Sequence, residues 1–282
     1  MAFFVAINVI CSFMTTLLPL FSAFLIIFLP LTSTIVEINC KDRWFPIYAI
    51  ATVGLSIVVT LSSIDITLFY VVPSIFTGYI FGLFAKRDLP KMYAIFLSTI
   101  LQTLLSYMFI PLLNLIADID LIDLFAKMFR ISDIFLFKTT ILLLFFLLSL
   151  VQIVLSFIVV ENELKKFNQH FEELKNEEQI AGYSSIGCSL LAVIFSFIYL
   201  PLTYLFVGFS FFFATFVIFN QAKVNKVLPL ILDAVSLFIG LLLFALLNNL
   251  FDIGYSFTLL AIPTFLIGIT SMLYSFLKKS PQ

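Results

Sequence analysis

Apolar runs of bilayer length follow one another along almost the whole chain. The first of them, residues 2–36, contains no charged side chain. As one helix, rising about 1.5 Å per residue, it would be about 52 Å long, which exceeds a hydrocarbon core of about 30 Å. Pro19 divides the run, so we expect two helices, 3–18 and 20–36, with one span plus a re-entrant piece as the alternative. No basic region or small-residue cleavage site marks this run as a signal peptide, so we expect a retained membrane segment.

The remaining runs extend this interpretation to an all-α, polytopic transmembrane bundle. Only 11% of the residues are charged, against roughly a quarter in soluble domains, and the mean hydropathy is +1.19. These values exclude an ordinary soluble domain. The bundle is expected to have about ten spans, at residues 3–18, 20–36, 44–63, 66–85, 92–117, 139–160, 183–200, 203–220, 228–248 and 255–277.

The positions of Lys and Arg predict the orientation of these spans in a cell membrane. With both termini in the cytoplasm, the inner loops hold all the Lys and Arg residues except Lys127, Arg130 and Lys138. Such an excess of positive charge is typical of the cytoplasmic side. The sequence therefore predicts a multi-pass protein of the cell membrane with both ends inside.

One long charged stretch, residues 161–179, interrupts the apolar runs. We expect a single helix from Thr139 to Gln179 that stops at Gly182 and projects roughly 28 Å into the cytoplasm as an arm. The chain would then divide into a membrane bundle (1–160), the arm (161–179) and a second bundle (180–282). An apolar seam with spacings of three and four predicts a docking stripe on the arm, formed by Leu164, Phe167, Phe171 and Leu174.

The arm has two interpretations. It is either a solvated helical loop that leans on its own protein or a docking element for a partner membrane protein or a second copy. A different amphipathic segment, residues 118–131, predicts a helix that lies in the interface rather than spanning the bilayer. Leu121, Phe125 and Phe129 share its apolar face.

Small residues in the fourth span indicate a close helix contact. Gly78 and Gly82 form a GxxxG pattern flanked by Ser74 and Thr77. The contact is either internal helix packing or a face that touches a substrate or a partner subunit.

Polar residues inside predicted spans are the candidate ligand-binding groups. They comprise three amides, the acid Asp233 and the two hydroxyls Ser74 and Thr77; the amides are Gln102, Asn114 and Gln152. Buried amides join helices by hydrogen bonds or line a polar cavity. An acid within a span is expensive and is therefore a functional hypothesis, here a coupling or proton role for Asp233.

The sequence offers no enzyme motif. It lacks a GxxxxGK[ST] loop, an HExxH pair and a nucleophile elbow, and it has a single histidine, His170. The three cysteines are scattered and predict neither a metal site nor a redox pair. A net charge of −1 gives no nucleic-acid footprint. We expect no enzyme activity, cofactor, metal or nucleic-acid partner, and the lipid bilayer as the main surrounding.

Three stretches resemble the YybS-like membrane proteins of low-GC bacteria, whose function is not established. They are VVPSIFTGYIFGLFAKRDLPK (71–91), QIVLSFIVVENELKK (152–166) and FFFATFVIFNQAKVNKVLP (211–229). That family is distantly similar to the substrate-binding S components of energy-coupling-factor transporters, which recruit a separate membrane subunit and ATPases. The resemblance implies a small-molecule-binding or transport-associated subunit without its own ATPase. The alternative is a non-transporting scaffold or regulatory protein that acts through residues 161–179.

Overall fold

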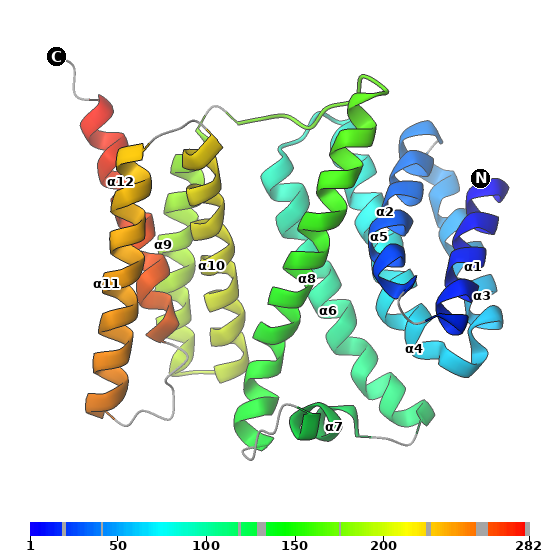
Figure 1. Ribbon diagram of the computed structural model, residues 1–282, viewed down its shortest axis with the longest axis horizontal. Coiled ribbons are helices and arrows are strands. Elements are labelled where there is room, and N and C mark those ends of the chain that lie inside the picture. Colours follow the sequence, from blue (N-terminus) through cyan, green and yellow to red (C-terminus); the bar gives the residue numbers. More distant parts are fainter. Residues whose placement is uncertain are drawn as a thin grey trace. The chain divides into compact units, whose positions relative to one another are not determined.

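The computed structural model describes residues 1–18, 21–40, 42–117, 120–128, 134–174, 176–223, 227–251 and 259–279. Within these ranges the chain is helical, with no named strand (Figure 1). The residues form two compact units. The first comprises Met1–Ile134 and Phe145–Glu173, and the second comprises Phe135–Leu144 and Leu174–Gln282.

The first unit contains most of the short helical segments. Its elements are α1 (Ala2–Leu17), α2 (Ser22–Asn39), η2 (Asp42–Trp44), α3 (Phe45–Val59), η3 (Leu61–Ser63), α4 (Ile64–Ile66), the π-helix η4 (Thr67–Val71), α5 (Val72–Lys86), α6 (Lys91–Ala117) and α7 (Leu121–Met128). It also takes the larger part of α8 (Ile134–Lys165). α5 packs along α2, and α1 packs on α3.

The second unit is a four-helix group. It consists of α9 (Glu177–Ser196), α10 (Leu200–Lys223), α11 (Val227–Phe251) and α12 (Ala261–Lys279). α9 packs against both α10 and α12, and α11 packs on α12. Four hydroxyl groups hydrogen-bond to one another where α9, α10 and α12 meet, and they belong to Ser185, Ser189, Ser210 and Thr264. Such hydroxyl contacts hold apolar helices together where burial of apolar surface alone does not.

Seven helices in the described ranges are long and apolar enough to cross a membrane. Three further apolar helices are shorter: Ala2–Leu17, Phe24–Asn39 and Ala261–Tyr274. The chain therefore has the character of a multi-pass membrane protein, and the count of ten spans stays a prediction. Residues 2–36 do form two helices, although Pro19, where we expected the break, lies outside the described residues.

The expected continuous helix from Thr139 to Gln179 is wrong, because α8 ends at Lys165. Asn168 adopts φ 57°, the left-handed conformation that closes a helix. The N–H of Asn168 bonds to the carbonyl of Lys165 at 3.3 Å, and the N–H of Gln169 bonds to that of Leu164 at 3.1 Å. This pair of bonds is a Schellman motif, which turns the chain away from the helix axis. Gly182, the expected stop, lies inside α9.

The charged segment folds back onto the first unit instead of projecting. The N–H of Glu172 bonds to the carbonyl of Leu89 at 3.2 Å, and the N–H of Lys91 bonds to the carbonyl of Glu172 at 3.3 Å. Lys91 Nζ also lies 2.6 Å from Glu173 Oε1. Residues 161–173 therefore belong to the body of the first unit rather than to a separate arm.

The seam that we expected as a docking stripe is only partly exposed, for the same reason. Leu164 and Phe171 are buried, Leu174 is half-buried, and only Phe167 is exposed, at 64%. The ring of Phe171 lies 4.9 Å from that of Phe157 and 6.4 Å from that of Phe81. These three aromatic side chains form one buried cluster, so most of the seam is core.

The described part of the amphipathic segment contains the expected helix. α7 covers Leu121–Met128, and Phe129 and Arg130 lie outside the described residues. Leu124 and Met128 are exposed, whereas Ala126 is buried. Lys127 Nζ lies 2.6 Å from Asp123 Oδ2, and this hydrogen bond and charge raise the pKa of Lys127.

Candidate ligand-binding site

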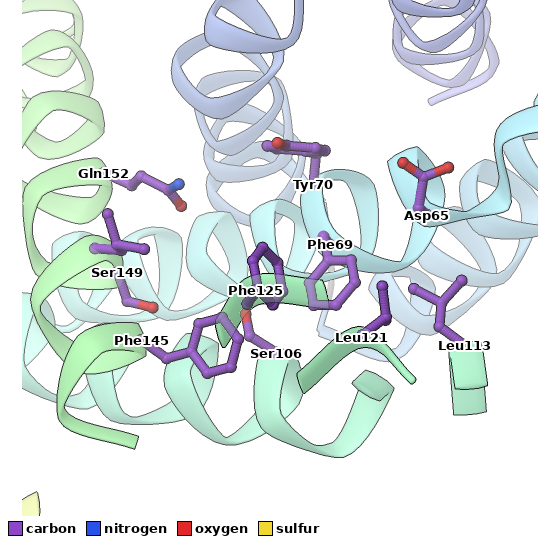
Figure 2. A pocket seen from close by; sticks show the side chains of 11 residues that line it. Asp65, Phe69, Tyr70, Ser106, Leu113, Leu121, Phe125, Phe145, Ser149 and Gln152 are labelled. Atoms are coloured by element: carbon purple, nitrogen blue, oxygen red, sulfur yellow. The ribbon is translucent and has the colours of Figure 1, made fainter. Parts of the chain in front are cut away.

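A cavity of about 510 Å³ lies in the first unit, where α7 meets α4, η4, α6 and α8 (Figure 2). Pockets for small ligands commonly have about 300–1,000 Å³. Apolar and aromatic side chains make up most of the wall. Its lining residues are Asp65, Phe69, Tyr70, Ser106, Leu113, Leu121, Phe125, Phe145, Leu148, Ser149 and Gln152.

A π-helix presents two of the aromatic rings to this cavity. In η4 the N–H of Val72 reaches the carbonyl of Thr67, five residues back, instead of the usual four. Pro73 follows directly, lacks an N–H and crowds the carbonyl four residues before it, which explains the wider turn. The widened turn carries Phe69 and Tyr70, and such turns are frequent at functional sites.

Part of the polar wall comes from α6 and α8. Ser106 of α6 and Ser149 of α8 are buried at 7% and 3% exposure. Gln152 Oε1 accepts a hydrogen bond from Gln102 Nε2, which joins the two helices beside the cavity. Because this bond fixes the Gln152 side chain, the cavity has an ordered polar wall.

Two oxygen acceptors fix the start of α7 over the cavity. Asp120 Oδ1 accepts the N–H groups of Ile122 at 3.0 Å and Asp123 at 3.1 Å, the geometry of an N-cap. Asn114 Oδ1 accepts the N–H of Leu121 at 3.1 Å and so ties α7 to the end of α6. These bonds hold the apolar face of α7, with Phe125, against the cavity.

The structure separates the residues proposed from the sequence. Gln152 lines the cavity, Gln102 holds it in place, and Asn114 anchors α7. Ser74 and Thr77 are buried on α5 and do not line the cavity. Asp233 belongs to the second unit.

Gly78 and Gly82 lie at the close contact of α5 with α2. A β-carbon added at Gly78 would lie 2.5 Å from the carbonyl oxygen of Pro30. One added at Gly82 would lie 2.5 Å from the β-carbon of Glu37. In this chain the GxxxG pattern therefore serves an internal contact.

Asp233 is held by a local polar cluster in the second unit. Its side chain is 1% exposed, and Thr270 donates a hydrogen bond to Oδ1. Gln221 donates to Glu178 Oε1 at 3.1 Å and lies near the Asp233 carboxyl group. Oδ2 of Asp233 has no hydrogen-bond partner.

Sequence reasoning missed most of the cavity wall, including Asp65, Tyr70, Ser106 and Ser149. One signal was present, since Gln102 and Ser106 are four residues apart and Ser149 and Gln152 are three apart. Each pair therefore shares a helix face. The aromatic residues gave no signal, because phenylalanine occurs 37 times in the chain.

A second polar network, also missed, lies between α1, α2 and α3. Asn8 donates to the hydroxyl of Tyr48 at 2.5 Å and accepts from Thr32 at 2.8 Å. Ser33 completes it at 3.1 Å from the Tyr48 hydroxyl. All these groups are buried and paired, so the network holds helices together rather than forming an open site.

The described part of the cavity wall holds one acid and neither His nor Cys, so it gathers no set of metal ligands. Among the residues that the structure describes, no three His, Cys, Asp or Glu side chains gather closely enough to hold a metal ion. No family model, curated protein or solved structure matches this chain. The likeness to the YybS-like family stays a prediction.

Proposed function

We propose that this chain is a membrane protein that binds an amphiphilic small molecule in the cavity under α7 and works in transport with separate partner subunits. The cavity is the observation that carries the proposal. Its size suits a small ligand, and its wall combines apolar surface with a few fixed polar groups.

The predicted topology supports an outward-facing cavity. The Lys and Arg distribution places the turn around Asp65 and the segment with α7 on the outer side of the membrane. Both segments lie at one end of the first unit (Figure 1). A ligand would therefore enter from outside, as uptake requires. A C-terminal reporter fusion at Lys279 should report inside, and an outside signal contradicts this orientation.

The lack of an ATPase motif points to partners for energy supply. The alternative role as a scaffold rested on an exposed stripe, of which only Phe167 remains exposed. Binding is therefore the better-supported function.

Retention of ligand by purified protein tests the proposal. Ser149→Phe places a ring in the cavity, whereas Leu147→Phe adds a similar ring on the neighbouring, partly exposed position of α8, which does not line the cavity. Native mass spectrometry in nanodiscs should find a small molecule bound to the wild type and Leu147→Phe, and none on Ser149→Phe. Equal retention by all three contradicts binding in this cavity.

A further inference from the structure

The cavity under α7 has one acid and four aromatic rings on its wall. The acid is Asp65, and the rings belong to Phe69, Tyr70, Phe125 and Phe145 (Figure 2). Aromatic faces attract cations because the ring quadrupole is negative there. No Lys or Arg is among the described residues that line the cavity. The wall therefore favours positive charge in a ligand.

The acid is available for a ligand. None of the ion pairs between described residues involves Asp65. Asp65 is exposed, so water stabilises its charge while the cavity is empty. An anionic ligand, in contrast, would meet Asp65 without a neighbouring cation on the described wall.

We infer that the cavity binds an organic cation, namely a substituted ammonium group attached to an apolar body. The inference rests on the proposed function and adds the chemical class of the ligand. The ammonium group lies among the aromatic rings on the side of Asp65. The apolar body extends toward α8, where Phe145 and Leu148 line the wall.

A substituted ammonium fits this wall better than a metal ion does. Its alkyl groups lower its hydration, so rings can replace water around it, whereas a metal ion needs several oxygen ligands. The described wall offers a metal ion one carboxylate, that of Asp65, and Gln152 Oε1 already accepts a hydrogen bond from Gln102, so the wall is poorly suited to supply such a shell. Substituted ammonium groups occur both in free organic cations and in the head groups of phosphatidylethanolamine and phosphatidylcholine.

A pair of probes that differ only in charge tests the inference. One probe is phenylpropyl-trimethylammonium, and the other is its carbon isostere with a tert-butyl group. Titration calorimetry uses the full chain in nanodiscs of phosphatidylglycerol. The cation should bind at least about tenfold more tightly than the isostere, which corresponds to about 1.4 kcal/mol. Equal affinity of the two probes overturns the cation inference and leaves the proposed function standing.

Variants of the protein distinguish failure of the cation inference from failure of the proposed function. Asp65→Asn should reduce the preference for the cation, whereas Asp123→Asn, a nearby acid that does not line the cavity, should keep it. Ser149→Phe and Ser106→Phe should abolish binding of both probes while thermal unfolding shows that the variants are folded. If Ser149→Phe and Ser106→Phe are folded but bind the probes as well as the wild type does, the inference is overturned. It is also overturned if the wild type binds neither probe. Probe binding that is unchanged when these phenylalanine rings fill the cavity also counts against the proposed function.

A further titration with a second lipid identifies the source of the cation. Adding phosphatidylethanolamine to the nanodiscs weakens binding of the ammonium probe if the lipid head group occupies the cavity. It leaves binding unchanged if the ligand is a free organic cation. Both results support the ammonium class, and a gain in affinity on adding this lipid contradicts it.

Discussion

Gly82 of α5 packs directly against the side chain of Glu37 on α2. A β-carbon at position 82 would lie 2.5 Å from the Cβ and 2.7 Å from the Cγ of Glu37. One turn later, Lys86 Nζ bonds to the carbonyl of Cys40 at 3.3 Å and to Asp42 Oδ1 at 2.5 Å. The close approach at Gly82 thus places a cation at the C-terminus of α2, where it complements the helix dipole.

Gly82→Ala should destabilise the protein by about 1–3 kcal/mol, because the added methyl group overpacks the contact with α2. Gly54→Ala is the matched control, since a β-carbon there meets nothing within 4 Å. The control should be neutral or slightly stabilising, because alanine favours a helix by up to about 1 kcal/mol over glycine. Thermal unfolding in detergent measures both. Equal melting temperatures for the two variants contradict the close contact.

Phe171→Ala should destabilise the first unit by about 3 kcal/mol, the cost of removing a large buried aromatic side chain. The ring is 7% exposed and lies against Phe157 and Phe81. Thermal unfolding and the yield of monodisperse protein are the measurements.

Phe167→Ala is the control for this change, because the Phe167 side chain is 64% exposed. It should shift stability by less than about 0.5 kcal/mol. If Phe171→Ala lowers the stability no more than Phe167→Ala does, residues 169–173 do not pack on the first unit as the structure describes.

The charged segment illustrates what periodicity could and could not predict. The seam at Leu164 and Phe171 correctly marked apolar side chains that need a partner surface. A spacing of three and four is equally compatible with a helix and with a turn that interrupts it, so the spacing does not indicate where the helix ends. The interruption depends on Asn168 adopting φ > 0, which Asn tolerates but does not require.

The helices themselves were predictable because apolar runs of bilayer length leave the backbone little other choice. The cavity was not, because it combines side chains from five separate elements whose packing the sequence does not specify. Gln102 and Gln152 were identified as polar residues within spans, but nothing in the sequence indicated that they bond to each other.

Asn168→Gly should leave the protein as stable as the wild type or up to about 1 kcal/mol more stable, because glycine adopts φ > 0 without a steric cost. Asn168→Val should destabilise it by about 1–2 kcal/mol, because a β-branched residue resists φ 57°. Hydrogen exchange at the amide of Gln169, which bonds to the Leu164 carbonyl at 3.1 Å, reports on the turn. Faster exchange in the glycine variant than in the valine variant contradicts the Schellman motif.

The last prediction concerns how α7 is held over the cavity. An eight-residue helix is marginal by itself and depends on its caps. Asp120→Ala removes the acceptor of two backbone N–H groups, a loss of about 1 kcal/mol. Local opening of α7 should then become about fivefold more frequent, since opening follows the free-energy difference.

A cysteine in place of Phe125, which lines the cavity, should react about fivefold faster with a membrane-impermeant thiol reagent in the Asp120→Ala background. Asp123→Ala is the control, because it removes only an exposed pair with Lys127 worth about 0–1 kcal/mol. Unchanged reactivity in the Asp120→Ala background would show that the cap does not hold α7 in place.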